Sequence, residues 1–175
     1  MESHSTCPLL SPIQFEKHVY KLLSNLGKDL TNFKAEHRAK LIGLDGEYEI
    51  DVVACFEVFG TNFKVLVECK CHHYSIKRDV VQVLNDRIRT IGAQKGIIFS
   101  TSNYQKGAID YASKHGIALI RVSKDELTWK TRNKADDSND INLPIISWIV
   151  FSDPEVLNTT TLDRDTHQLQ NILFN

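Results

Sequence analysis

The stretch GLDGEYEIDVVACFEVFGTNFKVLVECK, residues 43–70, decides the fold, because it predicts two strands joined by a tight turn. Tyr48 to Val58 has the pattern of one strand and Phe63 to Cys71 that of the next. Phe59-Gly-Thr-Asn62 supplies the hairpin turn between them. Across such a hairpin, Asp51 on the first strand is expected to lie close to Glu68 on the second.

Further elements flank this hairpin in an order typical of an α/β domain. A helix with Ser11 as its N-cap and Pro12 at its first position is expected to end at Gly27. The last two strands of the series flank a helix, so we expect them to be parallel neighbours. The remaining expected elements are a strand at Phe33–Leu41, a helix capped by Ser75 and running to about Ile91, a strand at Gly96–Ser100, a helix at Lys106–His115 and a strand at Ile117–Val122.

The expected organisation is one core domain over residues 11–122, with a flexible leader at 1–10. An extension at 123–175 is expected to pack on the core or to extend it. Within it, Lys130 to Asp140 is polar and loop-like, Pro144 to Phe151 (PIISWIVF) predicts an added strand, and Asp163 to Phe174 predicts a helix.

Composition is that of an ordinary globular protein, with 42% hydrophobic and 25% charged residues and a net charge of -1. The charges are unevenly placed: residues 43–63 hold five acids and no Lys or Arg, whereas residues 64–95 hold seven bases and three acids. That order suits a metal site beside a phosphate-binding surface, although scatter produces similar deviations. No secretory signal and no apolar run of membrane-spanning length is found, so we expect a cytoplasmic protein whose four cysteines are reduced.

Glu68 and Lys70 are two residues apart on one strand, so they should share a face while Val67, Cys69 and Cys71 take the other. With Asp51 opposite, two carboxylates and an ammonium converge at a strand end. Two carboxylates suit Mg²⁺, with Mn²⁺ as a substitute and the backbone carbonyl of Cys69 as a further ligand. Such a group fits phosphodiester hydrolysis.

The alternative interpretation is a solvent-facing strand whose charged residues have no function, because Glu-x-Lys alone is a weak motif. Two details argue against it. Glu68 and Lys70 follow the apolar run Val65-Leu-Val67, and Asp51 lies within the apolar strand Ile50-Asp-Val-Val-Ala54. Charged groups inside apolar strands need partners or a function.

These motifs resemble the PD-(D/E)xK nuclease superfamily, and its Mrr-type restriction endonuclease branch most of all. The resemblance covers roughly residues 11 to 122 and departs from the superfamily name at Ile50, where a Pro would stand. It implies a restriction-endonuclease-like core, a mixed central β-sheet flanked by helices in the order αβββαβαβ. The motifs that carry it are Phe15-Glu16, Gly43 to Asp51, Val67-Glu-Cys-Lys70, Val80-Val-Gln82, Gly96 to Ser102 and Gly116 to Ile120.

The resemblance implies that Asp51, Glu68 and Lys70 are catalytic, that Gln82 lies near them, and that Glu16 joins the metal site. For Glu16 and Gln82 the alternative is an exposed position on a helix surface.

The segment Cys69-Lys-Cys-His-His73 invites a zinc interpretation, but its spacing is poor and a buried cysteine pair is favoured. His72, His73, Lys77 and Arg78 are expected either to line a loop that contacts DNA or to be merely solvated.

The expected function is a Mg²⁺-dependent endonuclease acting on double-stranded DNA, in restriction or defence. The alternatives are a structure-specific nuclease such as a Holliday-junction resolvase, and a catalytically silent DNA-binding module on the same fold. A homodimer is expected because a double-strand cut needs two sites, and a partner protein is one source of specificity.

Overall fold

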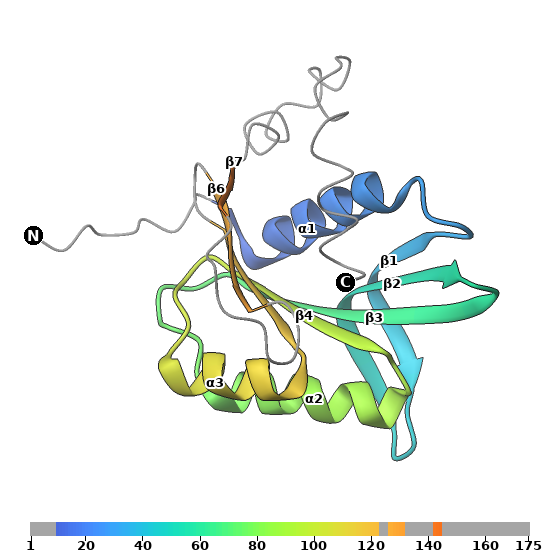
Figure 1. The fold of residues 1–175 in the computed structure, drawn as a ribbon. Coiled ribbons are helices and arrows are strands. Elements are labelled where there is room, and N and C mark those ends of the chain that lie inside the picture. The colour runs from blue at the N-terminus through green and yellow to red at the C-terminus, as the bar shows by residue number, and fades with distance from the viewer. Residues whose placement is uncertain (1–9, 123–125, 132–141, 145–175) are drawn as a thin grey trace, which may run out of the picture.

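The computed structural model describes residues 10–122, 126–131 and 142–144 and forms one mixed sheet between two helical layers (Figure 1). Seven strands follow one another across the sheet in chain order, β1 to β7. The elements are α1 (Pro12–Gly27), β1 (Lys34–Ile42), β2 (Glu47–Val58), β3 (Thr61–Lys70), α2 (Arg78–Ile91), β4 (Lys95–Ser100), α3 (Lys106–His115), β5 (Ala118–Val122), β6 (Glu126–Thr131) and β7 (Asn142–Pro144).

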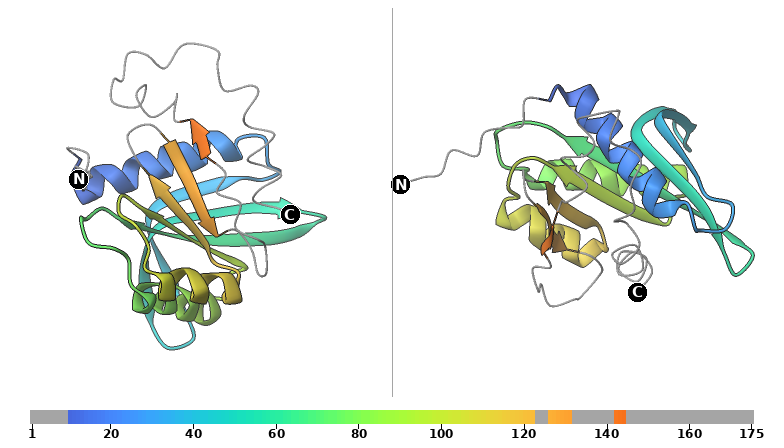
Figure 2. Two further views of the ribbon diagram at one scale, coloured as in Figure 1. Left: turned by 60° about the vertical axis from the view of Figure 1, so that its left-hand side comes forward. Right: turned by 90° about the horizontal axis from the view of Figure 1, so that it is seen from above.

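The order αβββαβαβ predicted for residues 11–122 is confirmed. β1, β2 and β3 pair antiparallel, and β3, β4 and β5 pair parallel, as a helix between successive strands requires. Helix α1 covers one face of the sheet, and α2 and α3 lie side by side on the other (Figure 2).

Helix α1 begins where its sequence predicts. The Ser11 hydroxyl accepts a hydrogen bond from the Gln14 amide, and the Gln14 side chain accepts one from the Ser11 amide, which completes a capping box. The buried face of the helix then packs against the sheet through Phe15, Val19, Leu22, Leu23 and Leu26.

Two clusters of buried residues, one on each face of the sheet, form the core. On the α1 face, strand residues such as Val52, Val67 and Cys69 join the apolar side of α1. On the other face, Ile50 and Leu66 pack with the apolar sides of α2 and α3.

The second helix starts later than predicted. Ser75 does not cap it; the N-cap is Lys77 and the helix begins at Arg78. The reason is a tertiary contact: the Ile76 amide donates to the Asn103 carbonyl, and the Gln105 amide donates to the Ile76 carbonyl. This bridge between two loops keeps the chain around Ile76 extended and delays the helix.

The extension contributes strands that the sequence only partly predicts. β6 pairs antiparallel with β5, although no strand was expected at Glu126–Thr131. β7 ends at Pro144, the residue at which the predicted strand Pro144–Phe151 begins. The rest of that segment and the predicted helix Asp163–Phe174 lie outside the described residues.

Candidate active site at a fork between two strands

Strands β2 and β3 separate at the residues that the sequence singles out. Their ladder ends with Val52 opposite Val67, whereas β3 continues beside β4 until Lys70 lies opposite Ser100. Beyond Val67, β3 therefore no longer pairs with β2. The Cys69 amide donates to the Asp51 carboxylate instead, with 2.7 Å between Cys69 N and Asp51 Oδ2. We call this place the fork and define it by Asp51, Glu68, Cys69 and Lys70.

A kink in β1 and β2 lies beside the fork. Val52 packs on the α1 face, and strict alternation would place Ile50 there too, yet Ile50 packs on the opposite face. In β1, Arg38 lies at the same level with φ of 55°, a left-handed conformation that costs energy in a non-glycine residue. The Arg38 guanidinium binds Glu49 Oε1 at 2.6 and 2.8 Å. Asp51 thus lies where the strand changes face.

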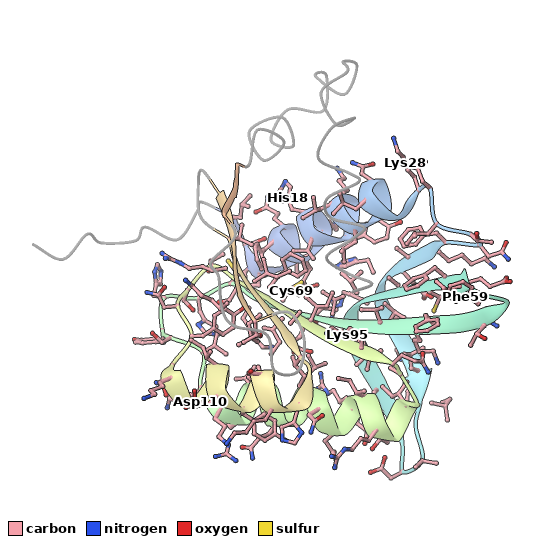
Figure 3. The ribbon with its side chains drawn as sticks, viewed as in Figure 1. His18, Lys28, Phe59, Cys69, Lys95 and Asp110 are labelled. Carbon is pink, nitrogen blue, oxygen red and sulfur yellow. The ribbon has the colours of Figure 1, made fainter. Side chains whose placement is uncertain are left out.

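Glu68 is held by two cations. It is 9% exposed, Lys70 Nζ lies 2.5 Å from Oε1, and Arg87 Nη1 lies 2.9 Å from Oε2. As predicted, Cys69 takes the opposite face from Glu68, in the layer beneath α1 (Figure 3).

Arg87 was not predicted, although its spacing carries a signal. Val80, Leu84, Arg87 and Ile91 follow one another at i, i+4, i+7 and i+11, which is one stripe of a helix. A charged residue inside an otherwise apolar stripe faces the protein and needs a partner there.

The environment of Asp51 opposes its ionisation. Burial above all, and then the negative charge of Glu68, raise the pKa of Asp51 to about 6, while the Cys69 amide and Lys70 act in the other direction. A divalent cation between the two carboxylates would remove this penalty. Two carboxylates with a backbone carbonyl fit Mg²⁺, which keeps several of its waters in protein sites.

Glu16 approaches the fork from α1 but has a partner of its own. Its Oε2 atom lies 3.0 Å from Nε2 of His37, a β1 residue that the sequence analysis did not single out. The charge of Glu16 is near enough to raise the pKa of Asp51, as the smallest of the five causes.

The two cysteines of the segment 69–73 behave as structural residues. Burial raises the pKa of the Cys69 thiol well above its ordinary value, and Cys71 packs against the same apolar cluster. Within the part of the chain that the structure describes, no group of three His, Cys, Asp or Glu residues is placed to bind a metal ion. The zinc interpretation therefore has no support, and a metal at the fork would rely on two carboxylates, a carbonyl and water.

The structure does not bring Gln82 to the fork. Gln82 is exposed and stands two residues before the buried Leu84, about 200° away around the helix, so it points away from the sheet.

The four residues predicted to contact DNA have different environments. His73 and Lys77 are exposed on the connection from β3 to α2. Arg78 is exposed too and lies over the Tyr111 ring, 5.0 Å from its centroid. His72 is partly buried, and its Nδ1 atom has no hydrogen-bond partner.

A separate apolar hollow of about 320 Å³ lies between α1 and the β2–β3 hairpin. Phe33, Phe56 and Phe63 contribute to its lining, whereas Asp51, Glu68 and Lys70 do not. The charged fork and the apolar hollow are therefore distinct features of the molecule.

Comparison with known proteins identifies the class. The family model Mrr_cat, described as restriction endonuclease, matches residues 9–128, so the chain belongs to this restriction endonuclease family. No curated protein matches the chain. The fold is the restriction-endonuclease-like one, with a mixed sheet flanked by helices.

Two solved structures are similar to this chain. One is a crystal structure described as a protein of unknown function, AF1548, with 23% identity and a TM-score of 0.49 over 60% of this chain and 56% of that one. The other is AspBHI, described as a DNA modification-dependent restriction endonuclease, with 16% identity and a TM-score of 0.40 over 70% and 36%. The chain thus spans less than two thirds of either protein.

Membership indicates a nuclease domain of the restriction-endonuclease type, a family that generally uses a divalent metal ion. Among the described residues, no helix has the length and apolar character needed to cross a membrane.

Proposed function

We propose that this protein is a metal-dependent endodeoxyribonuclease that hydrolyses DNA phosphodiester bonds at the fork. One observation carries the proposal: two carboxylates, Asp51 and Glu68, meet Lys70 at a point where β3 has lost a neighbouring strand. Charged residues without a function on a surface strand would not require Glu68 to be buried beside two cations, or the pKa of Asp51 to rise to about 6.

Mg²⁺, with Mn²⁺ as a substitute, would be held by Asp51, Glu68 and the Cys69 carbonyl, with Glu16 as a candidate for a second ion. When bound, the metal polarises a phosphate oxygen and lowers the pKa of its water. The Asp51 carboxylate is already oriented by the Cys69 amide. Lys70 Nζ can donate a hydrogen bond to the attacking water or to a phosphate oxygen, which offsets the charge that develops in the transition state.

DNA would approach over the connection from β3 to α2, where His72, His73, Lys77 and Arg78 follow the fork directly in the chain. Of these, His73, Lys77 and Arg78 are exposed, and exposed basic side chains suit contacts with backbone phosphates, which position DNA without reading its sequence.

We propose a homodimer, because two sites related by a two-fold axis can cut both strands of a duplex. Light scattering at micromolar concentration tests it. A mass near the 20.0 kDa of one chain, with double-strand cleavage first order in enzyme, would contradict the dimer.

The activity is tested by incubating the full chain with Mg²⁺ or Mn²⁺ and plasmid, modified plasmid or a four-way junction. We expect nicked or linear plasmid that requires metal and disappears with Asp51→Asn. Cleavage of the junction alone would favour a resolvase. Metal-independent DNA binding with no cleavage of any substrate would overturn the nuclease proposal.

A further inference from the structure

Arg87 is a charged group at the fork to which the proposed chemistry gives no task. It comes from α2, whereas the other members of the fork come from β2 and β3. Its guanidinium reaches Glu68 Oε2 at 2.9 Å, and its side chain is 26% exposed. Charged residues seldom point toward a protein core unless a partner of opposite charge is there. The contact with Glu68 therefore explains why Arg87 points inward.

The contact occupies an atom that a metal would need. Lys70 Nζ takes Oε1 of Glu68 and Arg87 takes Oε2, so both carboxylate oxygens are engaged. Lys70 shares its strand and its face with Glu68, which fixes the two side chains next to each other. Arg87 stands on another element, and its side chain is long enough to leave without any change in the backbone.

The charges of the fork also indicate that Arg87 opposes metal binding. Asp51 and Glu68 carry two negative charges when ionised, and Lys70 and Arg87 carry two positive charges, so the four groups are balanced as they stand. A divalent ion would enter a neutral site. Without Arg87 the site would have one net negative charge and would attract the ion more strongly.

With a metal bound, the positive charge of Arg87 would favour the transition state of cleavage. The four groups and the ion would then carry two net positive charges. A phosphodiester carries one negative charge, and the hydroxide that attacks it, formed when a water releases its proton to the solvent, adds a second in the five-coordinate phosphorane. An arginine suits this task, since its planar guanidinium binds phosphate oxygens in pairs. Charge that complements the transition state more than the ground state accelerates the reaction.

From this geometry we infer that Arg87 exchanges partners: it holds Glu68 in the metal-free protein, yields Oε2 to the metal, and then binds the phosphate that is cleaved. Arg87 would thus weaken metal binding while it speeds cleavage. The inference rests on the proposed function, and it names a catalytic residue on α2. A residue that merely supported Glu68 would have the opposite effect on metal affinity.

Mn²⁺ binding to the full chain without DNA, measured by calorimetry, tests the first half. For Arg87→Gln we expect binding about tenfold tighter than for the wild type. Arg87→Lys keeps the charge and should bind Mn²⁺ about as the wild type does. Arg89→Gln is the matched control, because Arg89 is an exposed arginine on the far side of the same helix and should change nothing.

Plasmid cleavage at saturating Mn²⁺ tests the second half. We expect Arg87→Gln to be about 100-fold slower, with Arg87→Lys in between. Weaker or unchanged Mn²⁺ binding by Arg87→Gln would overturn the exchange even if the wild type cleaves DNA. Tighter binding with an unchanged cleavage rate would overturn the phosphate contact. If the wild type cleaves nothing, the proposed function fails, and the binding measurement still decides whether Arg87 competes with metal.

Discussion

The two ends of the β2–β3 pair differ in structure and in role. At the hairpin end the ladder is continuous, Phe56 stacks on Phe63 with 5.7 Å between ring centroids, and the turn at Phe59 and Gly60 is exposed to solvent. At the fork end the ladder stops and charged side chains occupy the gap. Cys69 and Phe59 mark these two regions in Figure 3. A complete ladder of backbone hydrogen bonds stabilises the hairpin end. A reactive site instead needs backbone groups and carboxylates that the ladder does not already engage.

Lys70→Ala should have the largest effect on the fork end. We expect cleavage to fall about 1000-fold, because the group that compensates charge in the transition state is removed. Stability should change little, since Lys70 lies at a strand end. Lys40→Ala is the matched control: Lys40 is an exposed strand lysine that pairs with Glu47 on the surface. Equal cleavage rates for the two variants would remove Lys70 from the mechanism.

Phe56→Ala should have the largest effect on the hairpin end. Phe56 is 6% exposed, and its truncation should lower the free energy of unfolding by about 3 kcal/mol in urea titrations. Phe59→Ala at the exposed turn should change it by less than about 0.5 kcal/mol. Both variants should retain cleavage per folded molecule. A loss of activity in folded Phe56→Ala protein would show that the two ends are coupled.

Asp51→Asn should stabilise the metal-free protein above pH 6. The native pKa of Asp51 is about 6 and its ordinary value is 3.8, so the native state holds the proton to higher pH than the unfolded state does. The free energy of unfolding therefore falls as pH rises from about 4 to 6, and the penalty persists above 6.

The Asn variant lacks this penalty, so we expect it to be more stable by on the order of 1 kcal/mol at pH 8, after allowance for solvent screening. The difference should vanish below pH 4. Thermal melts of both proteins across this range measure it. An Asp51→Asn variant less stable than the wild type at pH 8 without metal would contradict the burial argument, and added Mg²⁺ should stabilise only the wild type.

Glu16→Gln should have the smallest effect at the fork, no more than about a tenfold fall in cleavage, because His37 already engages this carboxylate. A single-turnover assay compares it with His37→Ala, which frees Glu16 without removing it. If Glu16→Gln abolished cleavage as fully as Asp51→Asn, Glu16 would belong to the main metal site.

Local patterns in the sequence were sufficient for most of the fold. Alternation and turn residues place β2 and β3, and the capping residues place the start of α1. Where prediction was wrong, a contact between distant segments had intervened. Ser75 looked like a helix cap, but the bridge between Ile76 and Tyr104 holds that segment extended. At β6 the cause is different: no strand was expected there, although Thr128, Trp129 and Thr131 are residues that strands favour, and pairing with the neighbouring β5 supplies its hydrogen bonds.

By itself, the sequence predicted that Asp51 on one strand would lie beside Glu68 and Lys70 on the next, because a short turn fixes the register of the two strands and because Glu68 and Lys70, two residues apart, share a face. Only the tertiary structure decided what surrounds them. Arg87 and Glu68 are 19 residues apart in the chain, and Glu16 and His37 are 21 apart. Such contacts depend on how helices cross the sheet and on the kink beside Asp51. Packing of the whole domain sets that geometry, and no local pattern encodes it.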